Sequence, residues 1–148
     1  ARSPYLLSEE QTGAALMARG AGVSALGRVD ELTSSVDIYK ILGMLAGYPI
    51  DAAHLDGNLP EAFGGQRREY TVSNSIYPGQ TYKLAIRTKE HEFHLETKEF
   101  TRMDGTIDMS AYVWHLYERE GHREIWSDAL RDKFLAIVWQ HVASFAHV

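Results

Sequence analysis

Histidine, glutamate and lysine or arginine carry the chemistry that this sequence can offer, because it contains seven histidines and no cysteine. Without cysteine there is no disulfide, thiolate nucleophile or zinc–thiolate site. Glu92, His94 and Glu96 share one face of a predicted strand and could hold a hard divalent ion. Lys83 and Arg87 are expected to lie opposite these carboxylates and neutralise them. A solvated ladder of charges is therefore the preferred interpretation, and we predict neither a metal ion nor a cofactor.

A second cluster, His115, Glu118 and His122, contains residues that could form part of a zinc site. Gly121 is expected to end a helix before His122, which favours a chance cluster. The run Gly20–Ala25 superficially matches a dinucleotide-binding fingerprint, but a helix rather than a strand is predicted before it, so we reject that function.

His141 lies within the apolar stripe of the predicted last helix. Burial would lower the pKa of its imidazole and keep the ring neutral, as in a ligand pocket. The candidate pocket consists of His141, Trp139 and Tyr112. The alternative is a core histidine that is hydrogen-bonded to a backbone carbonyl.

The last helix is expected to begin near Glu124 or Ser127 and to be apolar on nearly every side. Ala129, Ala136 and Ala143 recur every seven residues, and such a line of small side chains lets another helix approach closely. With Trp139 at its edge, this line is the predicted oligomer interface, and a second copy of the chain is the expected partner. The alternative is a central helix that its own domain encloses.

Residues 68–98 alternate between apolar and polar side chains and predict a three-stranded antiparallel meander. A three-residue loop, Pro78 to Gln80, and a two-residue turn, Lys89-Glu90, keep the apolar faces aligned. In this register the apolar pairs are Ile86 with Phe93 and Leu84 with Leu95. The same register yields three pairs of opposite charge: Arg87 with Glu92, Lys83 with Glu96, and Glu69 with Lys89.

Capping and stop signals predict helices over about residues 8–19, 36–46 and 109–120, in addition to the last helix. Residues 23–29 could form a short strand, and residues 51–66 predict a long loop with one helical turn. The expected fold is therefore α+β, in the order α-α-β-β-β-α-α, with the N-terminal and C-terminal helices covering one face of the sheet.

The length of 148 residues fits a single domain over 1–148, and the net charge of −5 disfavours nucleic acid and anionic membranes as partners. No apolar run is long enough to span a bilayer, and we expect a cytoplasmic protein. The preferred hypothesis is a non-enzymatic interaction or regulatory module that self-associates through its last helix. The alternative is a small-molecule-binding domain or small enzyme with a pocket between the sheet and the helices around His141.

Overall fold

The computed structural model describes residues 7–20, 22–49 and 55–144, and it divides the chain into two compact units. The first unit is Ala1–Gly13 with Val72–Val148, and the second is Ala14–Thr71. The expectation of a single domain stays a prediction.

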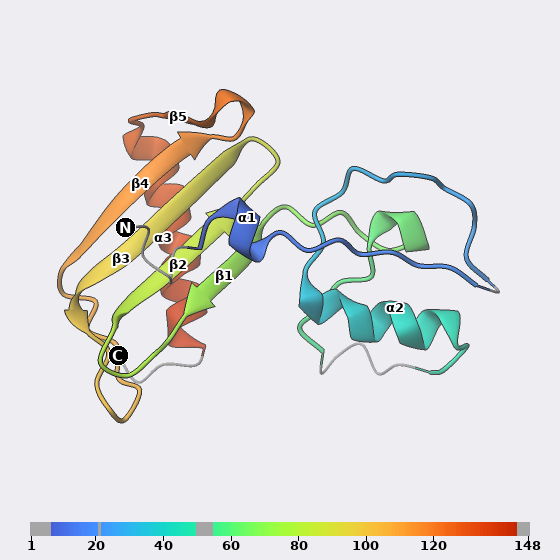
Figure 1. Ribbon diagram of the computed structural model, residues 1–148, viewed down its shortest axis with the longest axis horizontal. Helices are drawn as coiled ribbons and strands as arrows, with labels where there is room; N and C mark the ends of the chain where they lie inside the picture. The colour runs from blue at the N-terminus through green and yellow to red at the C-terminus, as the bar shows by residue number, and fades with distance from the viewer. Residues whose placement is uncertain (1–6, 21, 50–54, 145–148) are drawn as a thin grey trace. The chain divides into compact units, whose positions relative to one another are not determined.

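A five-stranded antiparallel sheet dominates the first unit (Figure 1). Each strand pairs with the next one in sequence, so the sheet is a meander of short connections. Its strands are β1 (Thr71–Ser75), β2 (Thr81–Arg87), β3 (His91–Phe100), β4 (Tyr112–Glu118) and β5 (Arg123–Glu124). The α+β class is confirmed, whereas the predicted three-stranded sheet was too small because the chain adds two strands after residue 100.

The predicted pairing of β2 with β3 is confirmed residue by residue. Ile86 pairs with Phe93 and Leu84 pairs with Leu95, while Arg87 pairs with Glu92. Lys83 pairs with Glu96, and their charged groups lie 3.5 Å apart. The remaining predicted pair of charges stays untested, since Glu69 precedes β1.

The prediction of a helix over 109–120 was wrong, because residues 112–118 form strand β4. Asp108 accepts a hydrogen bond from the backbone N–H of Ser110, two residues on, and so closes a turn rather than capping a helix. Aromatic and β-branched side chains dominate the segment Tyr112–Glu118 and favour a strand. Pairing with the open edge of β3 then supplies the backbone hydrogen bonds.

The predicted first helix was also too long, since α1 spans only Glu9–Thr12 and its Ser8 cap makes no side-chain hydrogen bond. Residues 23–29 form no strand. In the second unit, helix α2 (Ile38–Leu45) follows the 3-10 turn η1 (Ser35–Asp37) and matches the predicted helix closely. The single helical turn expected in the long loop is η3 (Glu61–Phe63), while residues 51–54 lie outside the described part of the chain.

A buried carboxylate organises the second unit. Asp37 accepts hydrogen bonds from the backbone N–H groups of Ser34 and Asn58, at 2.8 and 2.7 Å. The Arg68 guanidinium completes the cluster as its ion-pair partner. Asp37 therefore connects the start of α2 to Asn58, 21 positions further along the chain.

Helix α3 (Asp128–Ala143) begins as predicted, with the Ser127 hydroxyl accepting from the backbone N–H of Leu130. It packs along one face of the sheet (Figure 1), where Phe134 stacks on Phe93 with ring centroids 5.3 Å apart. The buried side chains of this layer come from alternate strand positions and from one side of α3: Tyr82, Leu84, Ile86, Phe93, Leu95, Leu116, Phe134, Val138 and Val142.

The expectation that the first and the last predicted helix cover the same face of the sheet was wrong. α1 and α3 belong to opposite faces of the sheet, because the segment that leads into α1 contacts Arg87 on the face turned away from α3. That face is polar and could not accept the apolar side of a second long helix.

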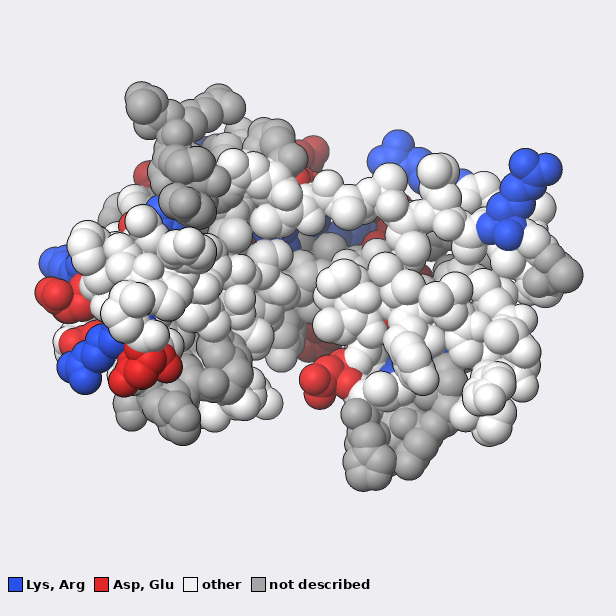
Figure 2. Space-filling view, turned by 60° about the horizontal axis from the view of Figure 1, so that its bottom comes forward, with Lys and Arg blue, Asp and Glu red and all other residues white. Residues whose placement is uncertain are grey.

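No helix in the described part of the chain is both long and apolar enough to cross a membrane. In the view of Figure 2, acidic and basic side chains lie side by side over part of the surface, and neither sign forms one large patch. On this face, the net negative charge of the chain is therefore not gathered in one place.

Replacement of Phe134 by alanine is expected to lower the free energy of unfolding of the first unit by about 3–5 kcal/mol, because the ring is fully buried and its removal leaves a cavity. Urea unfolding followed by tryptophan fluorescence measures this change, since all three tryptophans lie in the first unit. Lys133→Ala, at an exposed position of the same helix, should change stability by less than about 0.5 kcal/mol. Equal losses in the two variants would contradict the packing described above.

Candidate functional site

The face of the sheet that α3 leaves open carries most of the ionisable side chains of the meander. Residues two apart along a strand point to the same face, so three strands each contribute a polar row. These rows are Lys83, Ala85 and Arg87 on β2, Glu92, His94 and Glu96 on β3, and Val113, His115 and Tyr117 on β4. The register of β3 and β4 places His94 directly opposite His115.

The Glu92 carboxylate forms the centre of this face and is only 1% exposed. Its Oε1 atom lies 2.6 Å from Nη2 of Arg87 and 2.8 Å from Nε2 of His94. Burial by itself would raise the pKa of Glu92, but the hydrogen bonds and charges of His94 and Arg87 outweigh it and lower the pKa below its usual value. Glu92 is therefore an ionised, acceptor-only group inside the protein.

The N-terminal segment crosses this face and is held by two arginines. Arg87 donates to the backbone carbonyl of Leu7, and Nη2 of Arg119 lies 2.6 Å from the Glu9 carboxylate. Arg119 also donates to the carbonyl of Thr88 at 3.1 Å. The segment thus covers charges that sequence analysis expected to be solvated, and Arg87 is only 6% exposed.

Between this segment and the sheet lies a cavity of about 630 Å³. It is bounded by the N-terminal segment, by the polar rows of β2 to β4 and by the turn before β5. The residues that line it are Leu7, Ser8, Glu9, Lys83, Leu84, Glu92, His94, Leu95, Glu96, Val113, His115, Tyr117 and His122. Its volume falls within the range of roughly 300–1,000 Å³ that is typical of small-molecule sites.

Four aromatic or imidazole rings gather at one side of this cavity. Tyr117 stacks almost parallel on His122, with centroids 5.1 Å apart, and His115 and His94 lie within 6.2 Å of the same ring. Burial, followed by the charges of Glu124 and Glu92, raises the pKa of Tyr117. The Tyr117 hydroxyl is therefore neutral at neutral pH, and both carboxylates disfavour its ionisation.

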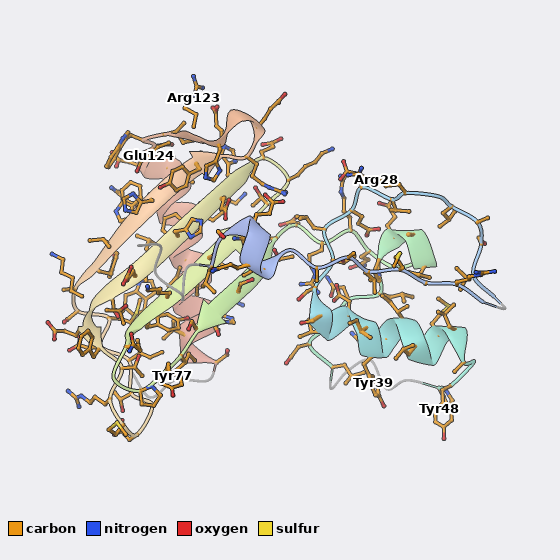
Figure 3. All side chains as sticks on the ribbon, in the orientation of Figure 1. Arg28, Tyr39, Tyr48, Tyr77, Arg123 and Glu124 are labelled. Carbon is orange, nitrogen blue, oxygen red and sulfur yellow. The ribbon has the colours of Figure 1, made fainter. Side chains whose placement is uncertain are left out.

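His115 has its own carboxylate partner, with 2.7 Å between its Nδ1 and Oε1 of Glu124. Glu124 comes from β5 at one end of the sheet, whereas Tyr77 lies at the opposite end (Figure 3). The cavity thus holds two imidazoles that are each fixed by a glutamate, through Nε2 in His94 and through Nδ1 in His115.

His122 has an unusual backbone conformation with φ of 50°, and it is the single non-glycine residue with positive φ in the described part of the chain. Left-handed conformations are uncommon for such residues, and strained backbone gathers at functional sites. Gly121 before it is also left-handed, with φ of 79°. This pair of residues turns the chain so that the His122 ring covers Tyr117.

The structure places the predicted pocket residues in different parts of the first unit. Nε2 of His141 lies 2.7 Å from the side-chain amide of Asn74 on β1, and burial lowers the pKa of this imidazole. Tyr112 pairs with Thr97 of β3, so two strands separate it from β1. None of His141, Trp139 and Tyr112 lines the cavity on the open face, and a pocket around His141 stays a prediction.

The predicted interface residues lie on the side of α3 that faces away from the sheet. Ala129, Ala136 and Ala143 are all exposed, and Trp139 is 43% exposed. The first unit therefore does not enclose this side of α3. Asp132, Lys133 and Gln140 flank the line of alanines.

Two histidine clusters had been weighed as metal sites. Within the described ranges, no group of three or more histidine, aspartate or glutamate side chains is arranged to hold a metal ion. His94 and Glu92 instead hydrogen-bond to each other, and Glu118 forms an ion pair with Arg123 at 2.8 Å.

The chain matches no protein-family model, no curated protein and no solved structure.

The sequence-based prediction placed the pocket elsewhere, around His141. Some lining residues of the cavity had been noticed, but they were interpreted as a solvated charge ladder (Lys83, Glu92, His94, Glu96) and a chance cluster (His115, His122). Reading residues 112–118 as a helix separated His115 and Tyr117 from the row of Glu92 and His94. If the same segment is treated as a strand, in which alternate side chains share a face, His115 and Tyr117 lie on one face. The covering role of Leu7 and Glu9 had no comparable signal in the sequence.

Replacement of Glu92 by glutamine is expected to destabilise the first unit by about 3 kcal/mol at neutral pH, because it leaves the buried Arg87 without its counter-charge. The folded-state pKa of Glu92 is lowered, so its ionised form contributes stability above the unfolded-state value of about 4.3. That contribution is lost as the pH falls through the lower, folded-state pKa.

The wild-type protein should therefore lose more stability on acidification through this range than Glu92→Gln does. Urea unfolding at a series of pH values measures both effects. Glu99→Gln, at an exposed position of the same strand, should follow the wild-type profile. Identical pH profiles for wild type and Glu92→Gln would show that the ion pair is not a determinant of stability.

Proposed function

We propose that the first unit is a binding module for a small molecule and that the cavity on its open face is the site. One observation carries this proposal: charged side chains at the centre of the face are buried beside a cavity of about 630 Å³ instead of being solvated. Buried charges cost stability unless they are well paired. The buried polar cluster on this sheet face therefore contributes little to the stability of the fold. Binding of a ligand in the adjacent cavity accounts for the cluster better.

The rigidity of the surroundings supports the same function. Glu92, His94 and His115 lie on the central strands of the sheet, and their rings or carboxylates are oriented by the hydrogen bonds described above. Sites built on strands hold their groups more accurately than sites on loops. The N-terminal segment adds Leu7, Ser8 and Glu9 as the opposite wall.

A fragment screen by NMR is expected to find small molecules that shift the resonances of His94, His115 and Tyr117. Val113→Trp should weaken such binding at least about tenfold, or 1.4 kcal/mol, because Val113 lines the cavity and the larger side chain fills it. Ile76→Trp, outside the lining and similarly exposed, is the matched control and should bind as the wild type does. Failure of every fragment to perturb these residues, or equal binding by both variants, would refute the proposed site.

Self-association through α3 is the second candidate function, with a second copy of the chain as the partner. The exposure of Trp139 and of the three alanines supports it, since a line of small residues allows close approach of another helix. Association would also bury the Trp139 indole, a side-chain type enriched at interfaces.

Light scattering coupled to size-exclusion chromatography is expected to show a dimer at a concentration on the order of tens of micromolar. Ala136→Glu should shift the protein to monomer by placing a charge in the centre of the contact. Gln80→Glu adds the same charge in the exposed loop between β1 and β2 and should leave the dimer intact. A monomeric wild-type protein would eliminate this function.

A further inference from the structure

The hydrogen-bonding groups of the cavity are unevenly divided between donors and acceptors. Three of the four side chains in its lining that carry a full charge at neutral pH are carboxylates: Glu9, Glu92 and Glu96. The fourth is the Lys83 ammonium, which lies 3.5 Å from the Glu96 carboxylate. An ionised carboxylate only accepts hydrogen bonds, so the charged lining is rich in acceptors.

Two carboxylates orient the imidazoles at the cavity. Because the ionised Glu92 can only accept, Nε2 of His94 must be the donor in their 2.8 Å hydrogen bond. The same reasoning makes Nδ1 of His115 the donor to Glu124.

The arginines near the cavity already donate to the protein. Arg87 donates to the Glu92 carboxylate and the Leu7 carbonyl. Arg119 donates to the Glu9 carboxylate and the Thr88 carbonyl. An anionic ligand that bound to either guanidinium would compete with these contacts, and one that bound to the Lys83 ammonium would compete with its Glu96 partner. A ligand with N–H donors meets acceptors without breaking any of them.

The electrostatic potential points in the same direction. Glu92 and Glu124 both disfavour a negative charge on Tyr117, which forms part of the cavity lining. The Glu96 carboxylate is partly exposed, and its Oε1 accepts from the Thr81 hydroxyl at 2.6 Å. Among the described contacts, its Oε2 atom accepts no hydrogen bond and can take one from a ligand.

From this inventory we propose that the cavity selects a small organic cation with several N–H donors, such as an amine, an amidine or a guanidine. The inference rests on the proposed function, and it adds the chemical class of the ligand. The N–H groups donate to the Glu96 carboxylate. The positive charge is stabilised by the carboxylates and by the aromatic ring of Tyr117.

Three probes of nearly the same shape test this inference: benzamidine, which is cationic, benzamide, which is neutral, and benzoate, which is anionic. Each is titrated into the full chain near neutral pH and followed by the NMR resonances of His94, His115 and Tyr117. We expect benzamidine to bind at least about tenfold more tightly than benzamide, and benzoate to bind most weakly.

Glu96→Gln should weaken benzamidine about tenfold and leave benzamide unchanged, because it removes the charge and keeps the shape. Glu99→Gln, further along the same strand and exposed, is the matched control and should change neither probe. Binding of benzamide or benzoate as tight as that of benzamidine would overturn the inference and leave the proposed binding function standing. Failure of all three probes and of every fragment to bind at the cavity would overturn both.

Discussion

The buried carboxylate of Glu92 is the constraint on which the first unit depends. A carboxylate on the central part of a sheet face either stays in water or finds partners that replace the water. Here Arg87 and His94 provide the partners from the same face, and Arg87 reaches further to the Leu7 carbonyl. The ion pair therefore replaces water as the partner of the Glu92 carboxylate. Through Arg87 it also holds the N-terminal segment over this face of the sheet. The other face of the sheet buries apolar side chains and needs no ion-pair partners, and α3 covers it with apolar side chains of its own.

The sequence was sufficient to predict the pairing of β2 with β3, because two independent signals agreed there. Apolar side chains fixed which face of each strand was buried, and opposite charges fixed the same register on the other face. It was also sufficient for α2 and α3, where the Ser34 capping box and the Ser127 cap mark the starts. In each case the residues that decide the structure lie within a few positions of each other or across one tight turn.

Strand β4, the burial of the charged pair and the cavity could not be predicted, because they depend on contacts between residues that are distant in the sequence. Residues 112–118 carry apolar side chains at spacings that fit a helix as well as a strand, and the open edge of β3 decides between them. The burial of Arg87 and Glu92 depends on Leu7, which is eighty positions from Arg87 in the sequence. The cavity combines these two effects, since it needs β4 as a strand and the N-terminal segment as a wall. For this reason its residues could be identified singly but not as one site.

The asymmetry of the two sheet faces also explains where a ligand can be accommodated. On the apolar face, large side chains of α3 pack against those of the strands, as the stacking of Phe134 on Phe93 illustrates. On the polar face, the covering segment is attached at Leu7 and Glu9, near the two arginines, and cannot interlock with a row of charged side chains. The volume that remains is bounded by groups already oriented by their ion pairs. The same charges that prevent close packing therefore both create the cavity and determine which ligand chemistry it favours.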